Sequence, residues 1–500
     1  MTALDWIVIA LYAAGMLAIG AFYARRTETT EDYLLGGRRM NPVAIGLSLF
    51  ATLMSTLSYL AWPGEMIKHG PTLFAGMLAY PFIAVVVGWL LIPYIMKLRI
   101  TSAYEVLEIR LGLGVRLVGS SLFLLLRFCW MASILFATSS QVLVPLLGLA
   151  DWTVPWLCAA LGLVTVVYTA SGGIRAVVLT DALQSAIMFL GAIVTLIVVS
   201  AELGPTAWWP ADWAEHWDPP VWGLDLTARA SLMGAITSAF TWHVCTAGSD
   251  QMAVQRFLAT RNVSAARRSM LTSYVSDVLI SILLGLVGFA VLAHFTARTS
   301  SPGGMNLVES ADRLFPRFVL EGLPAGLSGL VIAAILSAAM SSLSSGVNST
   351  CAVIAQDFVG RFGGRREGRP SPAHSISLVR WLSVGVGVSA VLLSILVSRF
   401  EGNLIELCFK VVNLLVAPLF VLFFMAMFVP WATPIGSLIG LAASLGVAVG
   451  IAHFHLFGVS FVWMMQAALV TGIAAGGLAS VIPLASTRTA NESPQGDGPG

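Results

Sequence analysis

A run of serines in an apolar stretch is the part of this sequence whose residue types and spacing best suit chemistry. Residues 333–350 read AAILSAAMSSLSSGVNST, and they carry no charge. On an α-helix, positions i, i+3, i+4 and i+7 share one face. The residues at these positions are Ala338, Ser341, Ser342 and Ser345, with Ser344 beside them. Their oxygens could replace part of the hydration shell of a small hard cation. The alternative is that small residues let membrane helices pack closely, with hydroxyls bonded to the preceding turn.

The composition is that of a polytopic membrane protein, so the predicted fold class is all-α. The chain has 500 residues, of which 57% are hydrophobic and only 10% charged, and its mean hydropathy is +0.87. Apolar runs of about 20 residues, each able to cross a bilayer, recur about thirteen times. The expected spans are 6–24, 43–66, 74–96, 117–148, 153–170, 180–201, 230–250, 271–294, 324–352, 376–398, 404–428, 433–453 and 459–485. Residues 1–485 then form a single transmembrane domain, and the polar tail 486–500 is predicted to be disordered.

Several function classes are excluded by what the chain does not contain. It has no GxxxxGK[ST] phosphate loop, so an ATP-driven pump in one chain is excluded. Its cysteines all lie in apolar runs, and they form neither a disulfide framework nor a metal motif. Paired acids or histidine clusters that would indicate an intramembrane enzyme are missing, so no enzyme and no organic cofactor is expected. The net charge of +2 gives no reason to expect a nucleic-acid partner.

The distribution of lysine and arginine predicts the orientation in the membrane. With the N-terminus outside, most basic residues fall in inner loops, and the opposite topology would reverse this. We therefore expect an N-terminus outside and a C-terminus in the cytoplasm. The expected location is the plasma membrane, as in a bacterial inner membrane.

A second polar interruption occurs in residues 41–69, which read NPVAIGLSLFATLMSTLSYLAWPGEMIKH. Four hydroxyl residues, Thr52, Ser55, Thr56 and Ser58, interrupt the apolar run. A helix broken near the bilayer midplane can offer carbonyls to a cation and a helix N-terminus to a solute. The alternative is an ordinary helix in which serine and threonine serve packing.

Several long motifs resemble the sodium:solute symporter family. They are TETTEDYLLGGRRMNP at 27–42, TSAYEVLEIRLG at 101–112, YTASGGIRAVVLTDALQ at 168–184, SDQMAVQRFLATRNVSAAR at 249–267 and GLSGLVIAAILSAAMSSLSSGVNS at 326–349. The resemblance implies a LeuT-like core of two inverted five-helix repeats, here 43–201 and 230–428, plus extra helices. It also implies two sodium sites. The main site would use Ala51, Met54, Ala338, Ser341 and Ser342, and a possible second site would use Asp181, Ser344 and Ser345 with Ser341.

Asp181 also has an argument of its own. A carboxylate at the start of the predicted sixth span requires a charge partner or a function. Neither that span nor the serine-bearing span contains a basic residue, so a cation could supply the partner. The alternative is that Thr180 and Asp181 cap the start of a helix.

The solute site is less clear in the sequence. By the resemblance, Leu53, Ser55 and Ser58 occupy solute-binding positions, and Leu53 disfavours a large sugar because it cannot bond a polyol. Arg127 or Lys410 could pair with a solute carboxylate, although Arg127 could instead extend toward the membrane interface. In the predicted seventh span Phe240, Trp242 and His243 could line the pocket, although a stripe of aromatic residues more often serves packing.

We therefore expect a sodium-coupled symporter for a small organic solute, such as a monocarboxylate or a similar organic acid. The alternative is a transporter-like sensor acting through a separate protein. The expected partners are the solute, sodium ions and the lipid bilayer, and the sequence does not indicate an oligomeric state.

Overall fold

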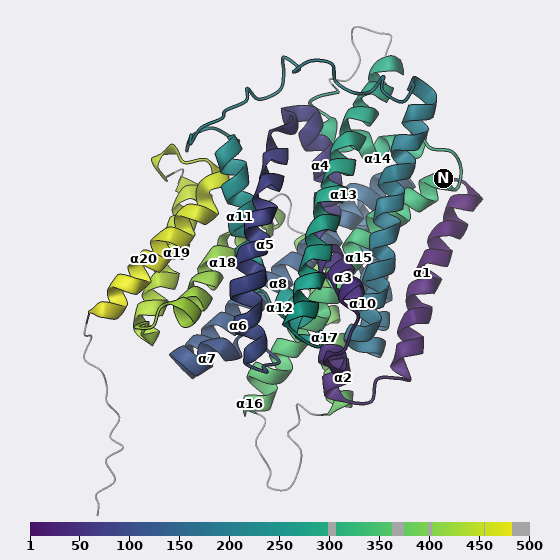
Figure 1. Ribbon diagram of the computed structural model, residues 1–500. Coiled ribbons are helices and arrows are strands. Elements are labelled where there is room, and N and C mark those ends of the chain that lie inside the picture. Colours follow the sequence, from purple (N-terminus) through teal and green to yellow (C-terminus); the bar gives the residue numbers. More distant parts are fainter. Residues whose placement is uncertain (299–306, 363–374, 399–402, 455, 483–500) are drawn as a thin grey trace, which may run out of the picture.

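The computed structural model shows a bundle of helices that run back and forth between two ends (Figure 1). It describes residues 1–298, 307–362, 375–398, 403–454 and 456–482, and for residues 398 and 403–413 it describes the backbone alone. The predicted tail 486–500 lies outside these residues. The described part contains helices and loops and no strand, as the all-α prediction requires.

The first half of the bundle contains helices α1 to α10. Their bounds are α1 Ala3–Ala24, α2 Thr30–Leu35, α3 Pro42–Leu53, α4 Thr56–His69, η2 Pro71–Ala79, α5 Tyr80–Val86, η3 Val87–Leu91, α6 Ile92–Lys97, α7 Glu105–Leu111, α8 Leu113–Ala137, η4 Thr138–Leu143, α9 Val144–Leu147, η5 Asp151–Thr153 and α10 Val154–Leu203. The second half begins after a long loop that contains several tryptophans. Its helices are α11 Leu232–Ser249, α12 Gln251–Leu258, α13 Val263–Arg298, α14 Ala311–Glu321, α15 Leu327–Val353, η6 Ile354–Val359, α16 Gly360–Phe362, α17 Ile376–Ser398, α18 Asn403–Phe428, α19 Pro434–Phe454 and α20 Met464–Val481.

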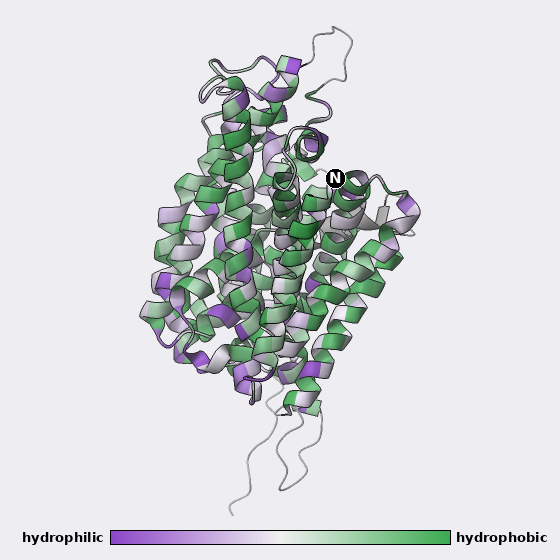
Figure 2. Ribbon diagram, turned by 90° about the vertical axis from the view of Figure 1, so that its right-hand side faces the viewer, coloured by the Kyte–Doolittle hydropathy of each residue, from purple (hydrophilic) through white to green (hydrophobic). Residues whose placement is uncertain are grey.

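Many of these helices are long and apolar enough to cross a bilayer. Among the described residues nine helices meet this test, and the bent pair α3 and α4 makes a tenth. Hydrophobic residues cover most of the length of the helices (Figure 2). The predicted total of about thirteen spans stays a prediction, because α10 covers two predicted spans as one helix.

Gly173 divides α10 into two segments. Its backbone lies at φ 61° and ψ −158°, a conformation that other residues rarely adopt. A Cβ at this position would lie 2.7 Å from the carbonyl oxygen of Tyr33 on α2. Because the second segment starts directly after Gly173, Asp181 lies inside a helix. The expectation that Thr180 and Asp181 cap a helix start is wrong, and the Thr180 hydroxyl instead donates to the carbonyls of Ala176 and Val177.

Helix α15, which carries the serine run, lies at the centre of the bundle. In its apolar window 94% of residues are buried, compared with 17% in α1 at the periphery. Alanine, serine and glycine dominate its sequence, and such small side chains allow neighbouring helices to approach closely. The N–H groups of Gly326 and Gly329 at its start donate to the carboxylate of Asp5 on α1, at 2.8 and 3.0 Å.

The two ends of the bundle differ in which short helices they carry. Helix α14 lies at one end, which we call the α14 end, and helices α7 and α16 lie at the other, which we call the α7 end (Figure 1). The start of α1 lies beside the start of α15, and the end of α1 is bonded to Arg380 of α17.

Candidate cation and solute sites

The break between α3 and α4 is the first element of the candidate site. The two helices meet at an angle of 68°. Met54 and Ser55 have extended backbones, and Ser55 caps α4 by accepting a hydrogen bond from the N–H of Ser58 at 3.3 Å. The break was predicted from the hydroxyl-rich sequence, and it exposes the last carbonyls of α3 and the first N–H groups of α4 at one place.

The five residues predicted for the main sodium site lie together at this break. The Ser341 hydroxyl lies 2.8 Å from the carbonyl oxygen of Ala51 and 3.3 Å from that of Ala338. The Ser342 hydroxyl lies 3.5 Å from the carbonyl oxygen of Met54. All five residues are buried. The sequence analysis missed Thr52, whose carbonyl accepts a hydrogen bond from Ser342 at 3.0 Å.

This arrangement suits a sodium ion better than a transition metal. The oxygens are neutral carbonyls and hydroxyls, which are hard ligands. Among the described residues no group of three or more His, Cys, Asp or Glu side chains could hold a metal ion. A sodium ion could therefore fasten α15 to the break between α3 and α4.

The residues predicted for a second sodium site also lie together. The Asp181 carboxylate is fully buried, and it accepts hydrogen bonds from Ser345 at 3.2 Å through Oδ2 and from Ser344 at 3.4 Å through Oδ1. Ser48 of α3, which the sequence analysis missed, donates to Oδ2 at 2.6 Å.

The argument that Asp181 lacks a charge partner is wrong. Arg256 of α12 lies 3.2 Å from Asp181 Oδ2, and its side chain is 1% exposed. The same guanidinium also donates to Ser48 at 2.9 Å, to the carbonyl of Met252 at 2.9 Å and to Ser345. Arg256 lies between the predicted spans 230–250 and 271–294, where the sequence predicts an inner loop, whereas all residues of α12 are buried.

The predicted solute residues near the break are only partly accessible. Ser55 is fully buried and serves as the helix cap, while Leu53 and Ser58 are half-buried. The hydroxyls of Ser55 and Ser58 lie 3.3 Å apart. Trp242 of α11 is also half-buried and packs against the large apolar core around α5, α8 and α18.

Arg127 has an internal partner that the sequence analysis did not foresee. Its guanidinium bonds to the carboxylate of Asp250, and the side chains of the two residues are 6% and 10% exposed. Asp250 separates α11 from α12, and it caps α12 by accepting from the N–H of Met252 at 2.9 Å. Arg127 was a candidate for the solute site because it would have been a buried cation without a partner, and its ion pair with Asp250 removes that reason. The side chain of Lys410 lies outside the described residues.

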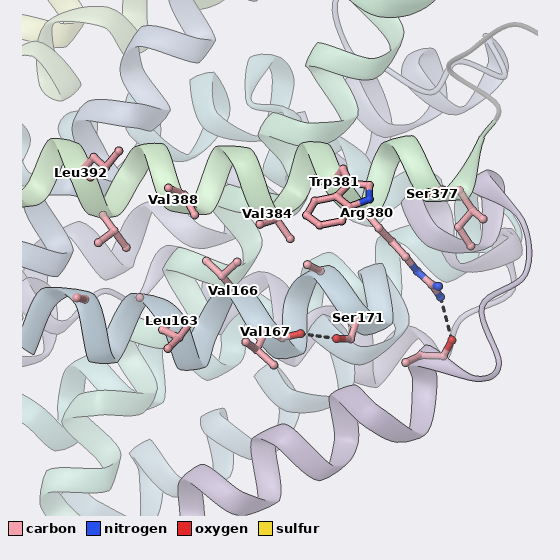
Figure 3. Close-up of a pocket in the computed structure, with 16 residues that line it drawn as sticks. Leu163, Val166, Val167, Ser171, Ser377, Arg380, Trp381, Val384, Val388 and Leu392 are labelled. Atoms are coloured by element: carbon pink, nitrogen blue, oxygen red, sulfur yellow. Dashed lines mark hydrogen bonds between the residues drawn. The ribbon is translucent and has the colours of Figure 1, made fainter.

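Two cavities lie at different places on the bundle. One of about 760 Å³ lies between α4, η4, α9 and α14, and its lining includes the polar side chains of Gln141, Asp312 and Arg317. The other, of about 730 Å³, lies between the first segment of α10 and α17, and apolar residues such as Val166, Val384 and Leu392 line most of it (Figure 3). At its end Arg380 donates to the carbonyl of Ala24 at 2.9 Å. The first cavity adjoins α4, which follows the break, and none of the residues that line the second belongs to either candidate cation site.

The chain is similar in sequence to known transport proteins. Residues 33–444 match the sodium:solute symporter family. The chain is 27% identical to the sodium/sialic acid symporter SiaT of Proteus mirabilis, over 88% of each protein. It is 30% identical to the sodium-dependent multivitamin transporter of Oryctolagus cuniculus, over 89% of this chain and 69% of the relative. It is 29% identical to human sodium-coupled monocarboxylate transporter 1, over 89% of this chain and 72% of the relative.

Solved structures confirm the fold. A Na⁺-coupled sialic acid symporter in a substrate-bound outward-open state superposes with a TM-score of 0.81 at 24% identity, over 96% of this chain and 98% of that one. The nucleobase-cation-symport-1 family transporter Mhp1, in a closed conformation, gives a TM-score of 0.55 at 17% identity, over 89% and 93%. The predicted LeuT-like architecture is thereby confirmed.

Proposed function

The chain belongs to the sodium:solute symporter family, and from this premise we propose that it carries a small organic acid together with sodium across the plasma membrane by alternating access. The chain is a sodium-coupled transporter and not an enzyme. The observation that supports the mechanism is the cluster of buried oxygens from Ala51, Met54, Ala338, Ser341 and Ser342.

Sodium at this cluster would couple ion binding to solute binding. It would fix the carbonyl end of α3 to α15 and so hold the break in one geometry. At the same break the N-terminus of α4 offers its first N–H groups and the positive end of a helix dipole, which favour a carboxylate. We therefore place the solute carboxylate at the start of α4, near Leu53, Ser55 and Ser58, with Trp242 as a wall. Arg127 does not contact the solute in this proposal. It binds Asp250 and so stabilises the junction of α11 and α12.

Two broken helices support the proposed inverted repeats 43–201 and 230–428. The first repeat begins with α3 and α4, broken at Met54 and Ser55, and the second with α11 and α12, broken at Asp250. The carboxylic acid as solute class is supported by the named substrates of the sialic acid and monocarboxylate relatives.

We also propose that Asp181, Ser344 and Ser345 form a second, weaker sodium site. Its ion would bind at Oδ1, since Oδ2 is shared by Ser48, Ser345 and Arg256. The guanidinium of Arg256 lies on the other side of the carboxylate, and repulsion between the two cations would lower the affinity.

For the orientation we propose that the α14 end faces outward, with the N-terminus outside. The α7 end carries Arg38, Arg99 and Arg110 in its loops and short helices and Arg175 just after the break of α10, as the positive-inside rule requires of a cytoplasmic face. A cysteine introduced at Asp151, an exposed position before α10, would be labelled from outside by a membrane-impermeant maleimide if this orientation is right.

Uptake of radiolabelled acids by proteoliposomes tests the proposed function. An inward sodium gradient should drive accumulation, and each sodium charge adds about 2.3 kcal/mol per 100 mV of membrane potential. An equal gradient of potassium or choline should give no accumulation. Solute binding without sodium-driven accumulation would favour the sensor alternative.

A further inference from the structure

Three titratable side chains from three helices meet inside the bundle at a place that the sodium sites do not use. They are Tyr80 of α5, His243 of α11 and Asp277 of α13. The Tyr80 hydroxyl donates to Asp277, and His243 Nε2 lies 3.0 Å from the Tyr80 oxygen and 3.7 Å from Asp277 Oδ2. The ring of Tyr274 packs edge-on against the rings of Tyr80 and His243.

Asp277 lies close to the depth of the break between α3 and α4. Helix α13 packs along both of these helices and runs in the same direction. Thr272 of α13 touches α3 at Gly46, and Gly288 of α13 touches α4 at Pro63. Asp277 lies between these two contacts, as the break lies between Gly46 and Pro63. Asp277 follows Thr272 by five residues and Met54 follows Gly46 by eight, so at about 1.5 Å per residue the carboxylate lies within about one helical turn of the depth of the break.

Asp277 does not point toward the lipid. Leu271, Val275 and Leu279 form the exposed face of α13, with exposed fractions of 42%, 58% and 51%. At 100° per residue, Asp277 lies about 200° from Val275 and from Leu279, on the opposite face. Its side chain, which is 23% exposed, faces α5 and α11.

No arginine among the described residues pairs with Asp277, in contrast to three buried acids of the bundle; a fourth buried acid, Asp5, accepts from backbone N–H groups instead. Asp181 pairs with Arg256, Asp250 with Arg127, and Asp357 with Arg116. Asp277 has an imidazole, which is mostly neutral at pH 7 unless its environment changes it. Arg267, on the same helix, donates to the carbonyl of Gly88 at 2.7 Å and stacks over Trp89. Among the described residues, none donates a hydrogen bond to Asp277 Oδ1.

We propose that Asp277 binds a cationic nitrogen of the co-transported solute, so that the solute is a zwitterion of the amino-acid type. An acid that faces the interior of a membrane protein without a cation requires one. Tyr80 and His243 engage Oδ2 and hold the carboxylate in place, while Oδ1 accepts from the ammonium group of the solute. This inference rests on the proposed function, in which the start of α4 binds the solute carboxylate.

Thermal stability of the purified full-length protein tests the inference with matched pairs of compounds. The pairs are alanine and propionate, leucine and 4-methylpentanoate, phenylalanine and 3-phenylpropanoate, and γ-aminobutyrate and butyrate, each in sodium and in choline. At least one amino compound should stabilise the protein in sodium, and its partner without nitrogen should stabilise it much less.

Two variants complete the test. Asp277→Asn keeps the size of the side chain and an acceptor for Tyr80, and it should weaken binding of the amino compound by at least ten-fold while sodium alone still stabilises the protein. Asp151→Asn, an exposed acid before α10, is the matched control and should bind like wild type. Uptake of the same radiolabelled compound by proteoliposomes should change in parallel.

Several results would overturn the inference. One is stabilisation by an acid without nitrogen that equals that of its amino partner. A second is an Asp277→Asn variant that binds the amino compound as wild type does, and a third is a panel in which no amino compound stabilises the protein. The inference is also overturned if Asp277→Asn leaves unchanged the ratio of affinities for an amino compound and its nitrogen-free acid. That result would indicate that His243 provides the cation for a simple carboxylate. Stabilisation that is equal in sodium and choline would contradict the proposed function itself.

Discussion

Replacing Arg256 by glutamine should destabilise the protein strongly, because it leaves the Asp181 carboxylate buried without its cation. Both side chains are at most 1% exposed. Removing one partner of a buried ion pair costs about 3–5 kcal/mol. We expect the lower end of this range, about 3 kcal/mol, because Ser48, Ser344 and Ser345 still donate to the carboxylate.

The double variant Asp181→Asn/Arg256→Gln should recover much of this loss. It contains no unpaired charge, and replacing both partners of a buried pair is often nearly neutral. The free energy of unfolding can be measured by titrating the detergent-solubilised protein with sodium dodecyl sulfate and following helicity, with choline in place of sodium. The double variant should be at least about 1.5 kcal/mol more stable than Arg256→Gln, within the range of coupling energies for contacting residues.

The effect of sodium on stability should show whether the Asp181–Arg256 pair also takes part in sodium binding or is purely structural. If a second sodium ion binds at Asp181, it can take the place of the guanidinium, and sodium should then stabilise Arg256→Gln more than wild type. The double variant should lose this additional effect. The reasoning is refuted if Arg256→Gln is as stable as the double variant, since Asp181 would then need no cation.

Two further predictions concern the scaffold. Gly173→Ala should lower the melting temperature by several degrees, because a residue with a Cβ rarely adopts this backbone conformation and the Cβ would contact Tyr33. Gly385→Ala, in an open position on α17, is the control and should leave the melting temperature unchanged. Equal melting temperatures for the two variants would contradict the strained break. Arg127→Gln should lower the free energy of unfolding by about 3 kcal/mol or more, because it leaves Asp250 without its structural partner, and it should reduce binding of every class of solute alike. Loss of binding for anionic solutes alone, with an unchanged free energy of unfolding, would assign Arg127 to the solute site again.

The serine face and the helix break could be predicted because both depend on local sequence. Ser341 and Ser342 share a face through helical periodicity, and hydroxyl residues around Met54 mark the position of the break. Neither inference needed knowledge of which helices are neighbours. The family resemblance added the prediction that the serine face lies against the helix break. In the structure the Ser341 hydroxyl lies 2.8 Å from the carbonyl oxygen of Ala51.

The ion pairs could not be predicted, because they join distant parts of the chain. Asp181 and Arg256 are 75 positions apart, and Arg127 and Asp250 are 123 apart. The sequence suggested that Arg256 lies in a loop, since α12 is too short to be recognised as a span. Asp277 was visible as an acid within the predicted span 271–294 and could have been noted as a candidate. Its partners Tyr80 and His243 become apparent only when α5, α11 and α13 are packed together.

Equilibrium binding of ²²Na⁺ to the purified protein tests most directly whether sodium binds between α15 and the break, and it requires no knowledge of the solute. Wild type should bind sodium saturably, and Ser341→Ala and Ser342→Ala should each weaken the binding by about ten-fold, since a lost hydrogen-bonding or ligand contact in a buried site is worth about 1–3 kcal/mol. Ser349→Ala is the matched control on the same helix, because among the described residues its hydroxyl bonds only to the carbonyl of Gly346, at 3.1 Å, and it should bind sodium like wild type. Sodium binding that is unchanged in both Ser341→Ala and Ser342→Ala would contradict the account.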